Sequence, residues 1–141
     1  MASGVAVADA CVTTFNELKL KHSMKFIIYG MDEAMKEIQV LKTGGKEATY
    51  DEFLKELPEA DCRYGVFDIE YEDPKTKSSR NKIAFFAWCP DVAKVKPKMI
   101  YASSKEELKK RLVGLACEIQ GSDQGDVEFQ EVVNHIIRVS K

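Results

Sequence analysis

The sequence predicts a mixed α/β fold, a sheet of about five strands with helices on both faces. Short runs rich in β-branched and aromatic residues alternate with segments whose apolar residues recur at helical spacing. Lys82–Cys89 (KIAFFAWC) is almost continuously apolar, which is typical of an interior strand. A helical segment and a further short strand follow it, so this pair of strands should be parallel, or at least share one sheet with a right-handed crossover. With 141 residues, 45% of them hydrophobic, the chain is expected to form a single domain, residues 1–141.

The first half of the chain predicts an arm, a helix and two strands. Residues 1–8 are small and apolar without a period, which predicts a flexible arm. Asp9 suits the N-cap of a helix that runs to about Lys21. A buried strand is expected at Phe26–Tyr29 and a half-exposed, alternating strand at Lys36–Lys42.

Turn and capping signals divide the middle of the chain. Gly44-Gly45 is expected to break it before a short helix. Thr49 and Glu52 form a capping box that would open this helix. Cys62–Tyr71 then predicts a strand, and the polar segment Glu72–Asn81 a projecting hairpin loop.

The end of the chain predicts one more strand and one more helix. The strand is expected at Leu115–Gln120, and Asp126 is expected to open the helix. Acidic residues gather at the start of this helix and Arg138 lies near its end, as the helix dipole favours. Its apolar residues keep helical spacing: Phe129, Val132, Val133, Ile136 and Ile137.

Asp91–Leu115 is the most basic segment of the chain. Seven basic and two acidic residues lie between Lys94 and Arg111, a local charge of +5 in a chain whose net charge is -2. Two helical halves are predicted here, either kinked near Ser103–Ser104 or stacked end to end, and Gly114 is a plausible stop. The predicted apolar stripe consists of Val95, Met99, Ala102, Leu108 and Leu112. Lysines four residues apart would form a ridge beside it.

The residues carry no recognisable catalytic or metal site. His22 and His135 lie far apart, with no carboxylate or cysteine at ligand spacing. Gly44-Gly45-Lys46 only partly matches a phosphate-binding loop. The pI of about 5.8 argues against a nucleic-acid binder, and no apolar run is long enough to span a membrane. The four cysteines form no CxxC motif, which favours buried free thiols: Cys11, Cys62, Cys89 and Cys117. These observations point to a binding protein without a cofactor.

Several stretches resemble the actin-depolymerising factor/cofilin family, and together they cover nearly the whole chain. They are MASGVAV at the start, FNELKL at Phe15–Leu20, DCRYGVFDIEY at Asp61–Tyr71, KIAFFAWCPDVAKVKPKMIYASSKEELKKRL at Lys82–Leu112, and IQGSD at Ile119–Asp123. The resemblance implies an ADF-homology fold and a cytoplasmic, monomeric, non-enzymatic protein of the actin cytoskeleton. It also implies binding of actin monomers and filaments with a preference for ADP-actin, and severing and depolymerisation of filaments.

The resemblance also implies which residues contact actin. Those expected to bind both monomers and filaments are Ser3, Gly4, Val5, Lys96, Lys98, Met99, Lys105, Glu106, Lys109 and Lys110. Those expected to bind filaments only are Arg80, Lys82, Asn134, His135 and Arg138, with Lys75 and Lys77 in support. Asn134 and His135 replace the acidic and basic residues that are common in the family. This difference bears on the strength of severing, and a histidine at this position would make filament contact depend on pH near neutrality.

Ser3 matches the family's regulatory phosphorylation site, where added negative charge would weaken binding to an acidic partner. Two alternatives stay open beside the leading interpretation. One is a phosphoinositide-binding module that uses the same lysines. The other is a protein that decorates filaments without severing them.

Overall fold

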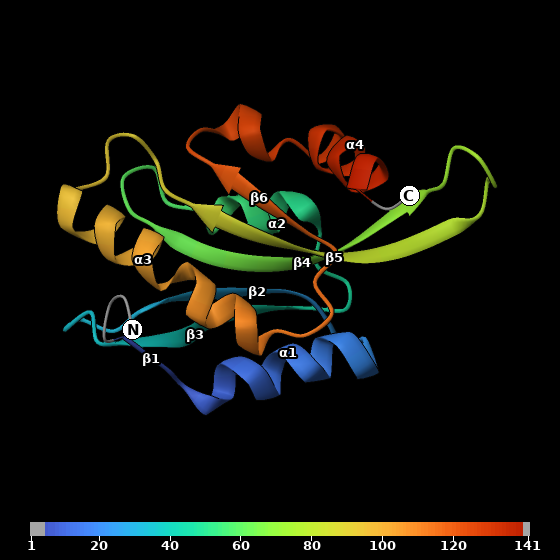
Figure 1. The fold of residues 1–141 in the computed structure, drawn as a ribbon. Helices are drawn as coiled ribbons and strands as arrows, with labels where there is room; N and C mark the ends of the chain where they lie inside the picture. The colour runs from blue at the N-terminus through green and yellow to red at the C-terminus, as the bar shows by residue number, and fades with distance from the viewer. Residues whose placement is uncertain (1–4, 140–141) are drawn as a thin grey trace.

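The computed structural model describes residues 5–139, which form one six-stranded sheet with helices packed on both faces (Figure 1). The elements are β1 Ala6–Val7, α1 Asp9–Lys21, β2 Met24–Met31, β3 Glu37–Gly45, α2 Tyr50–Lys55, β4 Arg63–Glu72, β5 Ser79–Trp88, α3 Val95–Arg111, β6 Cys117–Gly121, the 3-10 turn η1 Gln124–Val127 and α4 Phe129–Val139. The strand order is β1-β3-β2-β4-β5-β6. The two outermost pairs are parallel and the inner ones antiparallel.

Two apolar layers hold the helices to the sheet. On one face, α1 and α3 pack through Phe15, Leu18 and Leu108 against buried residues of the strands. On the other face, α2 and α4 pack through Phe53 and Val132. Figure 1 shows the two helix pairs on opposite sides of the sheet. The sequence prediction of helices on both faces is confirmed.

The predicted crossover is also confirmed. β5 and β6 are parallel, with Ala84 opposite Cys117 and Trp88 opposite Gly121, and α3 connects them. This connection fixes α3 along one face of the sheet, so the basic segment is held by the core on its inner side.

The sixth strand was not predicted. Ala6–Val7 pairs in parallel with Glu37–Ile38, and the side chains of Val5 and Val7 are buried. The predicted arm over residues 1–8 is therefore wrong from Val5 onward, because these two valines bury apolar area against the sheet edge. Residues 1–4 lie outside the described part of the chain.

Gly44-Gly45 does not break the chain. Both glycines belong to β3, and Gly44 pairs with Phe26 of β2. The predicted break is wrong because Gly44 is needed for close packing against the ring of Phe26, not for a turn.

The predicted helix starts are confirmed in one case and shifted in two. Thr49 accepts a hydrogen bond from the Glu52 N–H at 3.2 Å and caps α2. Asp9 is the first residue of α1 instead of its cap. Asp126 lies in η1, and α4 begins at Phe129, because the Asp126 carboxylate accepts from the Ser122 N–H at 2.9 Å.

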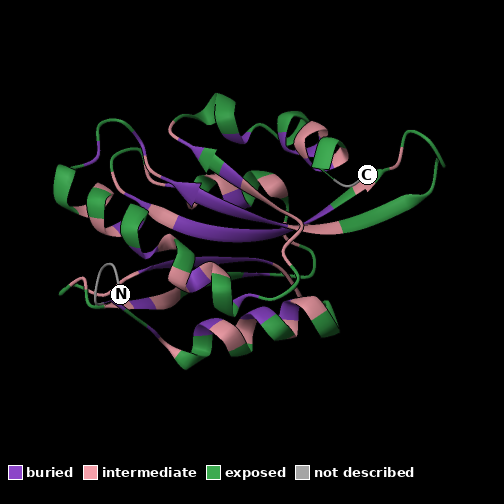
Figure 2. Cartoon of the chain, viewed as in Figure 1, coloured by how far each residue is buried: buried purple, intermediate pink, exposed green. Residues whose placement is uncertain are grey.

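The β4–β5 hairpin projects beyond the rest of the sheet. Its ladder extends to the pair Glu72–Ser79, so the connecting turn is shorter than the predicted loop Glu72–Asn81. Lys77 has a φ of 62°, a left-handed conformation that helps to close the turn. Figure 2 shows that the tip of the hairpin is exposed. The basic residues on it are therefore held away from the core.

Candidate binding surfaces

The basic segment forms one uninterrupted helix, α3, from Val95 to Arg111. The predicted division near Ser103–Ser104 is wrong. Ser104 is fully buried inside the helix, so its side chain lies on the inner face and does not open a second helix. Pro97 falls in the first turn, where a missing N–H costs little. Gly114, with a φ of +109°, follows the helix end as predicted.

Tyr101, Ser104 and Leu108 form the buried face of α3. The Tyr64 hydroxyl donates to the Tyr101 carbonyl at 2.5 Å, and the Tyr101 hydroxyl accepts from the Met31 N–H at 2.9 Å. These two hydrogen bonds fix how the helix is rotated about its axis. The helix therefore presents a defined outer face to solvent.

The predicted apolar stripe is correct for Leu108 and Leu112, which are buried, and wrong for its first half. Val95 and Met99 are 72% and 65% exposed, and Ala102 is exposed as well. Apolar residues recur on both sides of this helix, so spacing alone does not distinguish the core side from the solvent side. We call the outer side of α3, formed by Val95, Lys96, Lys98, Met99, Glu106 and Lys110, the α3 surface.

The lysines of α3 divide into two groups. Lys96 and Lys110 are exposed, and Lys98 is half-buried with its ammonium donating to the Asp91 carbonyl at 3.2 Å. Lys105 and Lys109 instead both bind one carboxylate, that of Glu118 on β6, with Lys105 Nζ 2.7 Å from Glu118 Oε2. The predicted ridge is therefore partly neutralised within the molecule.

Glu118 is the residue that sequence reasoning missed. Burial acts to raise the pKa of its carboxyl, but the hydrogen bonds and charges of Lys105 and Lys109 outweigh burial and lower the pKa overall. The sequence feature that indicates Glu118 is its place as an acidic residue on the strand that directly follows a basic helix in a crossover unit. Only the structure shows that this strand brings it beneath the lysines.

The N-terminal residues of the predicted site are only partly described. Val5 is 8% exposed and belongs to the same core cluster as Tyr101 and Leu108. Its side chain therefore supports the fold more than it presents a surface. Ser3 and Gly4 lie outside the described residues.

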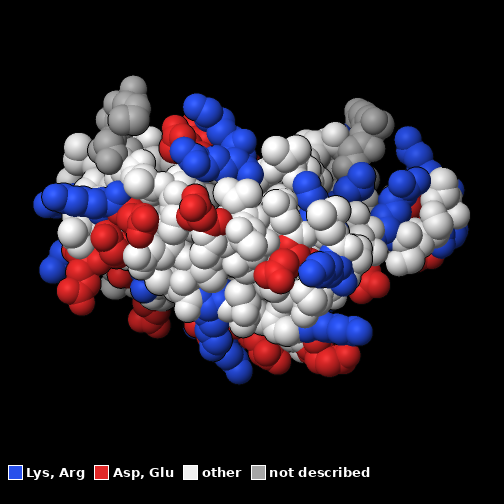
Figure 3. Space-filling model, turned by 90° about the horizontal axis from the view of Figure 1, so that it is seen from below, with Lys and Arg blue, Asp and Glu red and all other residues white. Residues whose placement is uncertain are grey.

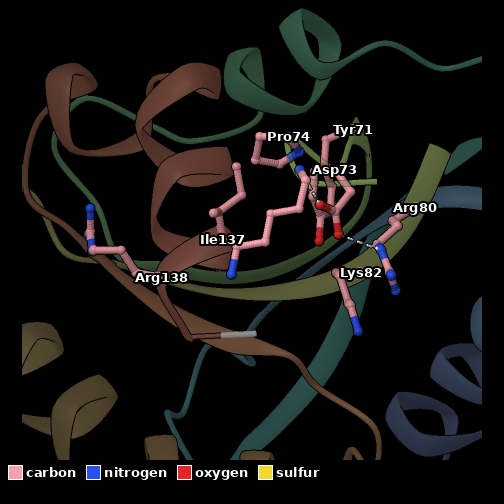
Figure 4. Close-up of a pocket in the computed structure, with 8 residues that line it drawn as sticks. Tyr71, Asp73, Pro74, Arg80, Lys82, Ile137 and Arg138 are labelled. Atoms are coloured by element: carbon pink, nitrogen blue, oxygen red, sulfur yellow. Dashed lines mark hydrogen bonds and ion pairs between the residues drawn. The ribbon is translucent and has the colours of Figure 1, made fainter. Parts of the chain in front are cut away.

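A second surface joins the hairpin to α4. A groove of about 310 Å³ is lined from both elements by Tyr71, Asp73, Pro74, Lys75, Arg80, Lys82, Ile137 and Arg138 (Figure 4). Arg80 Nε lies 2.8 Å from Asp73 Oδ2. The Lys75 N–H, followed by the other donors around Asp73 that include Arg80, lowers the pKa of this carboxyl. We call this cavity the hairpin–α4 groove.

The hairpin–α4 groove contains three of the five residues predicted to contact filaments only. Arg80, Lys82 and Arg138 line it, although they are far apart in the sequence. Asn134 accepts instead from Gln130 Nε2 at 3.0 Å, and His135 Nδ1 lies 3.3 Å from Arg138 Nη2. His135 and Arg138 also line a neighbouring groove with Glu118 and Glu131. Arg138 thus connects His135 to the hairpin–α4 groove.

The two surfaces lie apart on the molecule. Figure 1 shows the start of α3 at one end of the sheet and the hairpin at the other. In Figure 3, Lys and Arg side chains gather on the projecting hairpin, whereas elsewhere on that face they alternate with acidic side chains. A single partner site of ordinary size would therefore contact one surface or the other, and an assembly of several partner subunits could contact both.

Other kinds of site have little support. Within residues 5–139, no three His, Cys, Asp or Glu side chains are grouped so that they could hold a metal ion. Over the same residues, no helix has the length and apolar character needed to cross a membrane. All four cysteines are free thiols, two of them buried and two half-buried.

Comparisons with known proteins agree on one family. The model of the cofilin/tropomyosin-type actin-binding proteins matches residues 4–137. The chain is 47% identical over 138 residues to the cofilin of Mycosarcoma maydis, covering 98% of both, and 41% identical over 139 residues to the actophorin of Entamoeba histolytica, covering 99% of both. The crystal structure of Streptomyces griseoflavus cofilin matches with a TM-score of 0.89 and 44% identity, covering 96% of this chain and 99% of that one. The chain belongs to the cofilin/tropomyosin-type family of actin-binding proteins.

Proposed function

We propose that this protein binds actin monomers and filaments through the α3 surface and filaments, in addition, through the hairpin–α4 groove. As a member of its family it binds actin and depolymerises filaments. The proposal concerns which residues do so, and it includes severing of filaments, a preference for ADP-actin, action as a monomer and no catalytic activity.

The exposed Met99 and Val95 beside Lys96 and Lys98 are the observation that carries the proposal. Large apolar side chains on a rigid outer face, flanked by cations, suit an apolar contact with an acidic rim. Lysine stems can cover apolar surface while their charges steer the encounter with an acidic partner. The half-buried Lys98 is the cation expected to be most desolvated in the complex.

The second surface supports a filament contact by its position. Arg80, Lys82 and Arg138, together with Lys75, place four cations around one groove at the far end of the sheet from the start of α3. A partner subunit on the α3 surface would leave this groove open for a neighbouring subunit. A contact of this kind exists only where subunits are assembled, which is why we assign the groove to filaments.

Paired substitutions test the two surfaces separately. Lys96→Ala/Lys98→Ala should weaken binding to both monomers and filaments, by about 2 kcal/mol or more, which is about thirtyfold. Arg80→Ala/Lys82→Ala should leave monomer binding unchanged and reduce co-sedimentation with filaments. The matched control is Lys46→Ala/Lys55→Ala, which removes two exposed lysines elsewhere and should change neither. If both surface variants lost monomer binding equally, the assignment of the hairpin–α4 groove to filaments alone would be wrong.

Two further outcomes would replace parts of the proposal. If the wild-type protein floated with anionic vesicles and had no affinity for actin, phosphoinositides would replace actin as the ligand of the α3 lysines. Decoration of single filaments without an increase in breakage would favour side-binding without severing and would implicate Asn134 and His135.

A further inference from the structure

Cys62 and Cys89 form a close pair of thiols at one end of the β4–β5 ladder. Their sulfur atoms are 3.2 Å apart and are not bonded to each other. Arg63 pairs with Trp88, so Cys62 and Cys89 occupy the next opposed position of the two chains. The contact follows from the strand register and does not depend on a flexible loop.

The backbone at this position suits a disulfide. The Cys89 N–H donates to the Gly121 carbonyl of β6 at 2.8 Å, so the polar groups of Cys89 face away from β4. The two cysteines are then a non-hydrogen-bonded antiparallel pair, for which the Cα atoms are about 4.5 Å apart. This value lies at the short end of the Cα separations that disulfides span, roughly 4.4–6.8 Å.

We propose that Cys62 and Cys89 are an oxidation site, a dithiol that a peroxide converts into an intramolecular disulfide. This inference does not depend on actin binding. It concerns two residues that the proposed function leaves unused.

The burial of the two thiols determines which of them reacts with the peroxide first. Cys89 is half-buried and lines a pocket of about 140 Å³ together with Tyr101, Ala102 and Lys105 of α3. A peroxide is small enough to enter a pocket of this size. Cys62 is fully buried and does not line the pocket. Burial, followed by the hydrogen bond to Cys89, raises the pKa of Cys62 to about 12, so this thiol keeps its proton at neutral pH.

The reaction balances with a peroxide as the only oxidant. The Cys89 thiol gives up its proton as its sulfur attacks one peroxide oxygen and the O–O bond breaks. Cys89 becomes a sulfenic acid, and the other oxygen takes that proton and leaves as water or an alcohol. The Cys62 sulfur then attacks the Cys89 sulfur, the S–S bond forms and the S–O bond breaks. The hydroxide leaves with the Cys62 proton as water. Two thiols lose two electrons in total, and the peroxide gains them.

The disulfide would close a loop that contains the whole β4–β5 hairpin, and it would lie just before the connection to α3. Closing such a loop restricts the unfolded chain more than the folded one. The oxidised protein should therefore unfold at a higher temperature than the reduced protein.

The test uses the purified full chain, reduced and then freed of reductant. After treatment with hydrogen peroxide, the intact mass should fall by two hydrogen atoms, and peptide mapping without reductant should find Cys62 joined to Cys89. The thermal unfolding midpoint should rise, and dithiothreitol should reverse both changes. Detection of Cys89 as sulfinic acid with Cys62 still alkylatable would overturn the proposal. A disulfide to Cys11, to Cys117 or between two molecules would do so equally.

Three variants make the result specific. Cys89→Ser changes the half-buried thiol and should abolish the linked peptide and the rise in midpoint. Cys62→Ser should leave Cys89 to proceed to higher oxidation states. Cys117→Ser removes another half-buried thiol, on β6, and should form the disulfide as readily as the wild type. If Cys117→Ser alone prevented the change, the assignment to Cys62 and Cys89 would be wrong.

Discussion

At the scale of single residues, Gly44 packs against the closely packed aromatic ring of Phe26. A Cβ at this position would be 2.2 Å from Cε2 of Phe26, closer than real Cβ contacts allow. The Phe26 ring is 2% exposed and packs against Phe53 and Phe67, with ring centroids 5.5 and 6.1 Å away. A Cβ on Gly45, the next residue, would have no atom of residues 5–139 within 4 Å.

Gly44→Ala should therefore destabilise the fold while Gly45→Ala should not. The added methyl group forces the aromatic cluster apart, which typically costs about 1–3 kcal/mol. The Gly45→Ala change should stay within about 0.5 kcal/mol. Urea unfolding of both variants measures the difference. Equal stabilities would show that the cluster adapts to the extra carbon.

At the scale of the element, α3 uses its two sides for different purposes. Leu108 is fully buried between the helix and the sheet, whereas Met99, on the same helix, is 65% exposed. Both are unbranched at Cβ and similar in size. Substituting each by alanine therefore compares the two sides of one helix with similar chemistry.

Leu108→Ala should lower the free energy of unfolding by about 2–5 kcal/mol, because it leaves a cavity in the core. Met99→Ala should change stability by no more than about 0.5 kcal/mol but weaken actin binding by about 1–2 kcal/mol, roughly five- to thirtyfold. Urea unfolding and a monomer binding titration measure the two quantities on each variant. A Met99→Ala protein with unchanged affinity would place the actin contact elsewhere than on the α3 surface.

At the scale of the whole molecule, local sequence patterns predicted most helices and strands, but not which of their apolar residues are buried and which are exposed. The apolar run of β5 and the helix after it predicted the parallel crossover, because long periodic segments and short connections leave few topologies. Ala6–Val7 is too short to show the alternation of a strand. Met99 has the spacing of a buried helix residue, yet its side chain is exposed. Core and binding residues are both apolar, so spacing does not separate them.

The sequence resemblance indicated residues that line the hairpin–α4 groove, but no sequence pattern indicated their contacts. The resemblance indicated Arg80, Lys82 and Arg138, and the structure brings all three to one groove. The Glu118 contact with Lys105 and Lys109 joins a strand to a helix across the crossover. Contacts of this kind depend on tertiary packing, which neither composition nor periodicity encodes.

Several of the molecule's carboxylates should make its stability depend on acid pH. The pKa values of Asp73, Glu118 and Asp126 are all lowered in the folded protein. A carboxyl whose folded pKa is lowered stabilises the protein above its unfolded pKa, and that stabilisation is lost as the pH falls through the folded pKa. The free energy of unfolding should thus be nearly constant above about pH 5 and fall below about pH 4.

Glu118→Gln isolates one contribution to this curve. Near neutral pH the variant should be less stable than the wild type by about 1–2 kcal/mol, since Lys105 and Lys109 lose their charged acceptor. Below about pH 4 the difference should shrink, because wild-type Glu118 becomes protonated and resembles glutamine. Glu47→Gln, which removes the same charge from an exposed position, is the control and should follow the wild type throughout. Urea unfolding of all three proteins from pH 3 to pH 7 measures these differences in stability. If the difference in free energy of unfolding between wild type and Glu118→Gln did not vary with pH, the contact of Glu118 with the two lysines would contribute nothing to the acid sensitivity.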